Sequence, residues 1–539
     1  MTSLKNDVYD FIKDRKFLWP ILLIAFIAYA FTITHPVISI DDPTFHRFMA
    51  DGELIAQGRF GAVLLNAILP IYNFKPIFLD TMAVLIFMVA SVLWCVLIKR
   101  ASHDKIHPWA YPVFATAMIS YSMIAEIFIF MTMSLSVAMC NLLTVGALLL
   151  LQSYWKNKDM KLLFMIILAL GFVFSTYESS AALFISGIIM LFLLDTLYGP
   201  QSSYKVLFKR LLLGVGMVVG GLVIKYGITY LLLFIFDLER SIHGATQIAW
   251  LNRQWLGTFI NLVRKTFVQY GFAALYYYPI TIFVLTLVSG TILFSYLSLK
   301  QKNYKMILFY VAFAVSIFSL AILQGIVTPY RANQAISLFT SFVFMMLVSY
   351  ALKGQWSKWL KSVSLTVIAL LILMQAYDLN KWFYVDYMRY EEESRVMVEI
   401  YQYIGQHYGY DKPVVFVGNY YVSDNIRQYT TLKEDSLGGR VFTQVKDWYI
   451  FKIPYNTSTE PGYLYKYTQN VGNSVIDWGI NVFDSVNTEL IVFAKMHGLV
   501  LKGGTTAMYE SALTQSNALP KWPLEGSISN QADYILVHF

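Results

Sequence analysis

Apolar segments long enough to cross a lipid bilayer recur through the first 377 residues of this 539-residue chain. A helix needs about 20 mainly apolar residues to cross about 30 Å of hydrocarbon, and its backbone polar groups must be bonded within the helix. The sequence therefore predicts a polytopic α-helical membrane protein with about eleven transmembrane helices. They are expected near residues 17–34, 77–98, 109–128, 130–152, 161–175, 179–197, 208–236, 274–298, 306–323, 334–352 and 362–377.

The composition supports this class, because 57% of the residues are hydrophobic, 14% are charged and the mean hydropathy is +0.54. The net charge is +8, but the basic residues lie in short clusters between apolar segments, as in membrane proteins. Nucleic acid is therefore not an expected partner, whereas membrane lipids are. Cys95 and Cys140 both lie inside apolar segments and are predicted to pack in the core rather than to form a disulfide framework.

The charges of the connecting segments predict an orientation. The connections at 1–16, 99–108, 153–161, 198–210, 299–305 and 353–361 hold nineteen Lys and Arg residues, whereas the opposite set before residue 378 holds eight. The positive-inside rule then places the N-terminus in the cytoplasm. The first apolar segment has no clear cleavage site after it and is expected to be a retained helix. With eleven crossings, the loop after the first helix, residues 237–271, the turn at 328–331 and everything after residue 378 face outward.

The character of the sequence changes at residue 378, where long apolar segments give way to alternating polar and aromatic residues. We expect a transmembrane domain over 1–377 and an extracytoplasmic α/β domain over 378–539. Within the second, the pattern predicts a helix over 386–407 and strands over 413–419 and 534–539. Tyr463, Tyr465 and Tyr467 alternate as one face of a further strand would.

Two adjacent acids, Asp41 and Asp42, lie just beyond the first apolar segment. Pro43 suits the first turn of a helix, so Asp42 is a natural N-cap, whereas Asp41 has no such structural explanation. Asp41 is therefore the better candidate for a reactive base. The alternative is that both acids only solvate the end of the loop.

Basic residues follow this acidic pair closely, at Arg47, Arg59 and Lys75. Acids beside cations at a bilayer edge suggest chemistry on an anionic, lipid-borne substrate. Residues 45–56 have helical spacing of apolar side chains, and the polar face of that helix would carry His46, Arg47 and Glu53.

Further polar residues occur where apolar sequence surrounds them. Glu178 lies at a tight hairpin between two apolar segments, where it would position a substrate hydroxyl or pair with a cation on a neighbouring helix. Lys225 lies inside the seventh segment, where an ionisable residue is either functional or part of an internal ion pair.

Two arginines in outward connections are candidates for binding phosphate. Arg331 is the one cation in a short turn, and its guanidinium suits a pair of phosphate oxygens. Arg253 lies between Trp250 and Trp255 in an amphipathic loop, where the alternative is a bilayer anchor.

Several familiar kinds of site are missing from the sequence. It contains no HExxH or paired-cysteine zinc motif, no GxxxxGK[ST] phosphate loop and no GxSxG nucleophile. Nucleotide hydrolysis is therefore not expected, and an activated lipid would have to supply the energy for a synthetic reaction outside the cytoplasm.

Taken in order, these residues resemble the GT-C membrane glycosyltransferases, in particular the GtrII-like glucosyltransferases of bacterial surface polysaccharides. The resemblance covers about the first 380 residues. It rests on the acidic pair at the outer end of a first helix with a cytoplasmic N-terminus, Gly58-Arg59, the Tyr177-Glu178 hairpin, the Pro329-Tyr330-Arg331 turn and the outward C-terminal region.

The resemblance implies an inverting transfer of a sugar, expected to be glucose, from a polyprenyl-phosphate donor to a cell-envelope glycan on the outer face of a bacterial cytoplasmic membrane. A loop aspartate would be the base, and no metal or other cofactor is strictly required. A monomer is expected. The resemblance matches Asp41 and Asp42 to the catalytic positions and Arg331 to the cation beside the donor phosphate. Together with the residues singled out above, the predicted site comprises Asp41 and Asp42 as catalytic residues, Arg331, Arg253 and Arg59 near the donor phosphate, and Glu178, Tyr177, His46 and Arg47 as substrate-positioning residues.

Two other classes of protein remain open. A flippase for lipid-linked sugars or polysaccharide would also have many helices, but transporters commonly contain related halves and polar residues near the midplane. Here the polar residues gather at one rim, and no internal repeat is found. A membrane-anchored sensing protein, working through its C-terminal domain, would leave the acidic loop unexplained.

Overall fold

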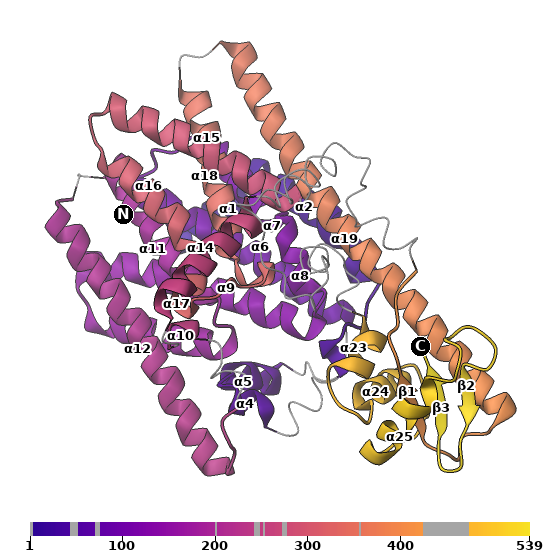
Figure 1. Ribbon diagram of the computed structural model, residues 1–539. Coiled ribbons are helices and arrows are strands. Elements are labelled where there is room, and N and C mark those ends of the chain that lie inside the picture. Colours follow the sequence, from indigo (N-terminus) through magenta and orange to yellow (C-terminus); the bar gives the residue numbers. More distant parts are fainter. Residues whose placement is uncertain are drawn as a thin grey trace.

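The computed structural model describes residues 4–43, 52–69, 76–199, 202–241, 248–251, 254–271, 278–354, 357–423 and 474–539. It is mostly helical, with a small sheet near the C-terminus (Figure 1). The predicted class, a multi-pass helical membrane protein, agrees with this architecture.

Within the described residues, nine helices are long and apolar enough to cross a membrane. They contain α2 (Arg15–Thr34), α6 (Pro76–Ala101), α7 (Ala110–Ile119) with its extension to Phe128, α9 (Met131–Asn157), α11 (Ser180–Tyr198), α12 (Tyr204–Phe236), α15 (Tyr278–Lys300), α18 (Ala335–Lys353) and α19 (Lys358–His407). Shorter apolar helices, α10 (Met160–Thr176) and α16 (Lys305–Ser316), overlap two further predicted segments. Every predicted segment thus overlaps a helix, while the count of eleven crossings stays a prediction.

The core of the helical body forms where α6 packs along α9, α10 against α12, and α18 against α7. Trp94 of α6 is fully buried, and its indole N–H donates to Oδ1 of Asn141 of α9 at 3.0 Å. Cys95 and Cys140 are buried and unpaired, as predicted. Apolar side chains of α12, such as Val223 and Phe234, are exposed on the protein surface, as expected for side chains that contact lipid.

The basic connections that were predicted to be cytoplasmic contact one another. Lys99 and Arg100 lie 3.6 and 3.2 Å from the carboxylate of Asp7 in α1 (Leu4–Lys13). Lys105 donates to the carbonyl of Tyr198, and Lys305 to that of Ser202. These segments therefore share one end of the body, and the side of the membrane that this end faces stays a prediction.

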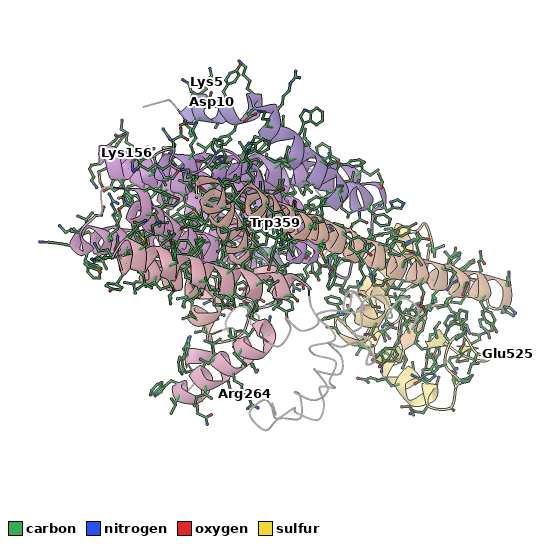
Figure 2. All side chains as sticks on the ribbon, turned by 90° about the horizontal axis from the view of Figure 1, so that it is seen from above. Lys5, Asp10, Lys156, Arg264, Trp359 and Glu525 are labelled. Carbon is green, nitrogen blue, oxygen red and sulfur yellow. The ribbon has the colours of Figure 1, made fainter. Side chains whose placement is uncertain are left out.

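Part of the amphipathic loop around Arg253 forms the helix α14 (Trp255–Tyr270). Trp255, Phe259 and Val263 are exposed on it, whereas Leu262 is buried. Figure 2 shows this helix, with Arg264 labelled, projecting from the main body of helices. Its placement at the bilayer surface stays a prediction.

The C-terminal region forms a small α/β layer against the end of α19 (Figure 1). Strand β1 (Val414–Val417) pairs in parallel with β3 (Ile535–His538), which pairs antiparallel with β2 (Ile528–Asn530), in the order β1-β3-β2. Among the described residues after β1 are the short helices α23 (Val475–Asn481), α24 (Thr488–Met496) and α25 (Thr506–Ser516).

The predicted helix over 386–407 and both predicted strands are confirmed, and Tyr463, Tyr465 and Tyr467 lie outside the described residues. The predicted helix is not a separate element, since α19 runs unbroken for 50 residues from the last apolar segment to His407. Met397, Ile400 and Ile404 of α19 pack with the strands in a second core. The division of the chain at 377 stays a prediction, and the helix that crosses it links the two cores.

Candidate active site

The acidic loop between α2 and the next helical residues is held by Asp42. Its Oδ2 accepts the backbone N–H of Ser39 at 2.8 Å, and its Oδ1 accepts the N–H and the hydroxyl of Thr132 at 3.3 and 3.1 Å. Thr132 lies in the first turn of α9, where backbone N–H groups have no partner within the helix. Asp42 therefore fastens the loop to α9.

The prediction that Asp42 is an N-cap is wrong, because residues 41–43 are already helical. Asp42 instead bonds back to the N–H of Ser39, three residues earlier, which is half of a capping box. Burial raises the pKa of Asp42 to about 7, although the hydrogen bonds from Ser39 and Thr132 oppose that shift.

The side chain of Asp41 has different interactions from that of Asp42. Among the described residues its side chain has no hydrogen bond or ion pair, but the charges of Arg331 and Arg59 act on it. Burial raises the pKa of Asp41, and these two guanidinium groups partly offset the shift. Asp41 is thus a buried carboxylate on which two cations act, and it forms no ion pair in the described part of the chain.

Arg331 lies in a short turn, η5 (Tyr330–Ala332), whose backbone is fixed from two sides. Its N–H donates to Oε2 of Glu126 at 3.1 Å, and its carbonyl accepts the hydroxyl of Tyr177 at 3.3 Å. The guanidinium lies over the ring of Phe130, 5.0 Å from its centroid, and forms no ion pair within the described residues. The backbone contacts therefore position a guanidinium that is available to an anion.

Arg59 immediately precedes α5 (Phe60–Ile68), which packs against the end of α10. The contact is close at Gly61, where an added Cβ would lie 2.4 Å from the hydroxyl oxygens of both Ser175 and Thr176. Only glycine permits this approach, which brings Arg59 near the hairpin of Tyr177. Burial raises the pKa of Tyr177, and the charges of Arg331 and Arg59 partly offset that shift. The hydroxyl of Tyr177 therefore remains a hydrogen-bond donor.

Glu178 and Lys225 form an ion pair with each other. Lys225 is 1% exposed on α12 and Glu178 is 40% exposed in the hairpin, so the lysine is the member that depends on the pair. The internal-ion-pair interpretation of Lys225 is confirmed. Glu178 therefore has a structural partner, and a role in positioning substrate stays a proposal.

Several predicted residues cannot be compared with the structure. His46, Arg47, Lys75 and Arg253 lie outside the described residues. Glu53, predicted on the polar face beside His46, begins α4 (Glu53–Ala56) and accepts hydrogen bonds from Gln57 and Ser241, each at 2.9 Å.

Two buried carboxylates at this end of the body were missed in the sequence. Glu126 bonds the Arg331 turn, and Asp80 of α6 accepts the hydroxyl of Ser134 at 3.2 Å and lies within electrostatic range of Asp42. Both are ionisable residues in apolar segments, where charge is costly and commonly functional. Lys225 was singled out in the sequence because it is an ionisable residue in an apolar segment, and Glu126 and Asp80 have the same property.

The described residues contain no group of three His, Cys, Asp or Glu side chains placed to hold a metal ion. Among the described residues, the charges of Arg59 and Arg331 both act on the carboxylate of Asp41. Such a set can accept a proton from a hydroxyl while it stabilises a departing anion.

In comparison with known proteins, residues 30–348 match a family model described as glucosyl transferase GtrII. This range contains Asp41, Arg59, Glu126, Tyr177 and Arg331. No curated protein matches the chain.

Proposed function

Because the chain belongs to the glucosyl transferase GtrII family, and is therefore an enzyme that transfers glucosyl groups, we propose that its donor is a polyprenyl-phosphate sugar. The acceptor in this proposal is a cell-envelope glycan on the outer face of a bacterial cytoplasmic membrane. The protein has a cytoplasmic N-terminus, works as a monomer and inverts the anomeric centre.

One observation carries the proposal: the charges of Arg59 and Arg331 converge on Asp41. A sugar carried on a lipid phosphate has a negative group one bond from its reactive carbon. Guanidinium groups suit that phosphate, because they offer several N–H donors in a fixed plane. A carboxylate beside them is then close to the bond that must break.

The reaction follows from these roles. Asp41 removes the proton of an acceptor hydroxyl, and the hydroxyl oxygen attacks the anomeric carbon. The bond from that carbon to the phosphate oxygen breaks, and polyprenyl phosphate leaves with the electron pair. In the transition state the transferred sugar has oxocarbenium-like character, and Arg331 and Arg59 stabilise the negative charge that develops on the departing phosphate.

Tyr177 and Glu178 have supporting roles in the proposal. Tyr177 holds the turn that carries Arg331, and its hydroxyl already donates to the Arg331 carbonyl. Glu178, paired with Lys225, lies in the same hairpin with a partly exposed side chain and would orient a substrate hydroxyl. His46, Arg47 and Arg253 keep their predicted roles in substrate and phosphate binding.

The test is transfer of radiolabelled glucose from polyprenyl-phosphate-glucose to the bacterial surface glycan by purified protein in detergent. Asp41→Asn removes the base without changing side-chain size, and base catalysis typically supplies about 10²–10⁴-fold in rate. Transfer is expected to fall by that factor, with unchanged thermal unfolding.

Asp42→Asn is the matched comparison, because it disturbs the bond to Ser39 rather than the proposed base. We expect it to lower the unfolding temperature more than Asp41→Asn does. Full activity of Asp41→Asn would overturn its role as base. Failure of the wild type with a panel of lipid-linked sugars would overturn the donor assignment and favour a flippase, which needs a sealed bilayer and breaks no bond.

A further inference from the structure

Glu126 occupies an unusual position for a carboxylate. It lies in α8 (Ala125–Phe128), a single helical turn just before the chain reverses into α9, and it is 8% exposed. Its neighbours in this turn, Ala125, Ile127 and Phe128, are apolar and buried. From these neighbours alone, a hydrophobic side chain would be expected at position 126.

Only one of the two carboxylate oxygens of Glu126 is bonded. Oε2 accepts the backbone N–H of Arg331 at 3.1 Å, whereas Oε1 is shielded from solvent and has no hydrogen-bond partner among the described residues. Buried polar atoms in folded proteins nearly always have a partner, and leaving a charged one without it is costly. Oε1 is therefore a buried acceptor for which the described residues supply no donor.

Glu126 belongs to the same cluster as Asp41. The charge of Arg331 acts on both carboxylates, and Tyr177 lies within electrostatic range of Glu126, Arg331 and Arg59. Glu126 accepts the backbone N–H of Arg331, so it contacts the residue that carries the proposed phosphate-binding guanidinium.

We propose that Oε1 of Glu126 accepts a hydrogen bond from a hydroxyl on the sugar ring of the donor, and that this contact selects the sugar. The inference rests on the proposed function, for which it names the residue that recognises the transferred group. A hydrogen bond from a hydroxyl to a carboxylate is stronger than one between neutral groups. A sugar lacking that hydroxyl leaves Oε1 unpaired, and sites of this kind reject such analogues strongly.

The experiment combines enzyme variants with donor variants. Purified full-length protein in detergent is given polyprenyl-phosphate-glucose and the 2-, 3-, 4- and 6-deoxy forms of that donor, and kcat/KM is measured for each. Glu126→Gln keeps the side-chain size and an acceptor for the Arg331 N–H but removes the charge. Glu399→Gln on α19, exposed and 3.8 Å from Arg395, is the matched control.

We expect the wild type to lose about 10- to 100-fold in kcat/KM with one particular deoxy donor. Glu126→Gln should lose a similar factor with the glucose donor, yet lose little more when that same hydroxyl is removed. The penalties for the other deoxy donors should be unchanged, and Glu399→Gln should reproduce the wild-type pattern throughout.

A purely structural role would give a different result, since Glu126→Gln would lower the rate by the same factor with every donor. That outcome overturns the inference while leaving the proposed function intact. Absence of transfer by the wild type from any lipid-linked sugar would instead overturn the proposed function and the inference with it.

A second variant tests the same contact in case Glu126→Gln does not fold. Glu126→Asp keeps the charge but draws the carboxylate back by one methylene, and the same donor should again show the reduced penalty. If neither variant folds, the wild-type profile decides: the inference fails if no single deoxy donor costs about 10-fold.

Discussion

The Nη2 atom of Arg389 lies 3.0 Å from the backbone carbonyl oxygen of Ile38, so helix α19 is bonded directly to the loop that carries Asp41. The same guanidinium bonds the carboxylates of Asp386, at 2.9 Å, and Glu393. Glu393 also accepts hydrogen bonds from Ser474 and from the backbone at the start of α23. The C-terminal region and the acidic loop are therefore parts of one buried polar network.

Replacing Arg389 with Met should destabilise the protein strongly. The change leaves the carboxylates of Asp386 and Glu393 buried without their cation, and breaking a buried pair in this way typically costs about 3–5 kcal/mol. Denaturant unfolding in detergent measures the loss. The matched control is Arg395→Met, with an expected cost under about 1 kcal/mol, because the Arg395 side chain is 70% exposed and its Nε lies 3.8 Å from the carboxylate of Glu399. Equal losses in the two variants would contradict the network.

The Glu178–Lys225 pair should respond asymmetrically to removal of either partner. Glu178→Gln leaves the ammonium of Lys225 buried at 1% exposure, whereas Lys225→Met leaves Glu178 in contact with water. We expect Glu178→Gln to be the more destabilising change, and the double variant to be more stable than Glu178→Gln alone. Unfolding temperatures of the four proteins form the cycle, and a purely additive result would show that the two charges do not depend on each other.

Arg331 should set the acid limb of the pH–rate profile. A base must be ionised to work, so activity falls as the pH drops through the pKa of Asp41. Arg331 lowers that pKa, and its removal must raise it. The acid limb of kcat/KM for Arg331→Gln should therefore move to higher pH. The rate at its optimum should fall by about 10²-fold, because one group that stabilises the leaving phosphate is lost.

Arg331→Lys keeps the charge and should keep the acid limb near its wild-type position, although it loses the paired N–H donors of arginine. A shift of the limb in Arg331→Lys as large as in Arg331→Gln would show that the charge is not the cause.

Gly61→Ala should disturb the placement of Arg59. The added Cβ would lie 2.4 Å from the hydroxyl oxygens of Ser175 and Thr176 and 2.8 Å from the carbonyl of Phe172, so α5 must move away from α10. Overpacking of this kind costs about 1–3 kcal/mol, and we expect the KM for the donor to rise as Arg59 moves. Gly227→Ala in α12 is the control, because nothing lies within 4 Å of its added Cβ. Wild-type donor binding by Gly61→Ala would refute this role of the contact.

Much of the helical architecture follows from local sequence. The length and apolar character of a segment are enough to locate a membrane helix, and the two predicted C-terminal strands follow from short apolar runs beside turns. Asp41 and Arg331 were recognisable as polar residues in short connections. Glu126 and Asp80 were not, because each lies within an apolar segment whose overall hydropathy conceals a single acid.

The partners of these residues could not be found from local sequence. Asp42 was expected to cap its own helix, but its bonds reach Thr132, 90 residues away, because α9 begins beside the loop. Lys225 lies 47 residues from Glu178, and Arg389 lies 351 residues from Ile38. Such pairs depend on which helices pack together.

The amino-acid sequence is sufficient to specify a multi-pass helical protein of the glucosyl transferase GtrII family, with acids and cations in its connecting segments, because these properties depend on composition and local order. The roles of the individual charges depend on packing. The helices bring Arg59 and Arg331 to Asp41, fasten Asp42 to α9, pair Lys225 with Glu178 and leave Oε1 of Glu126 unbonded among the described residues, since burial and charge act through space between residues far apart in the chain.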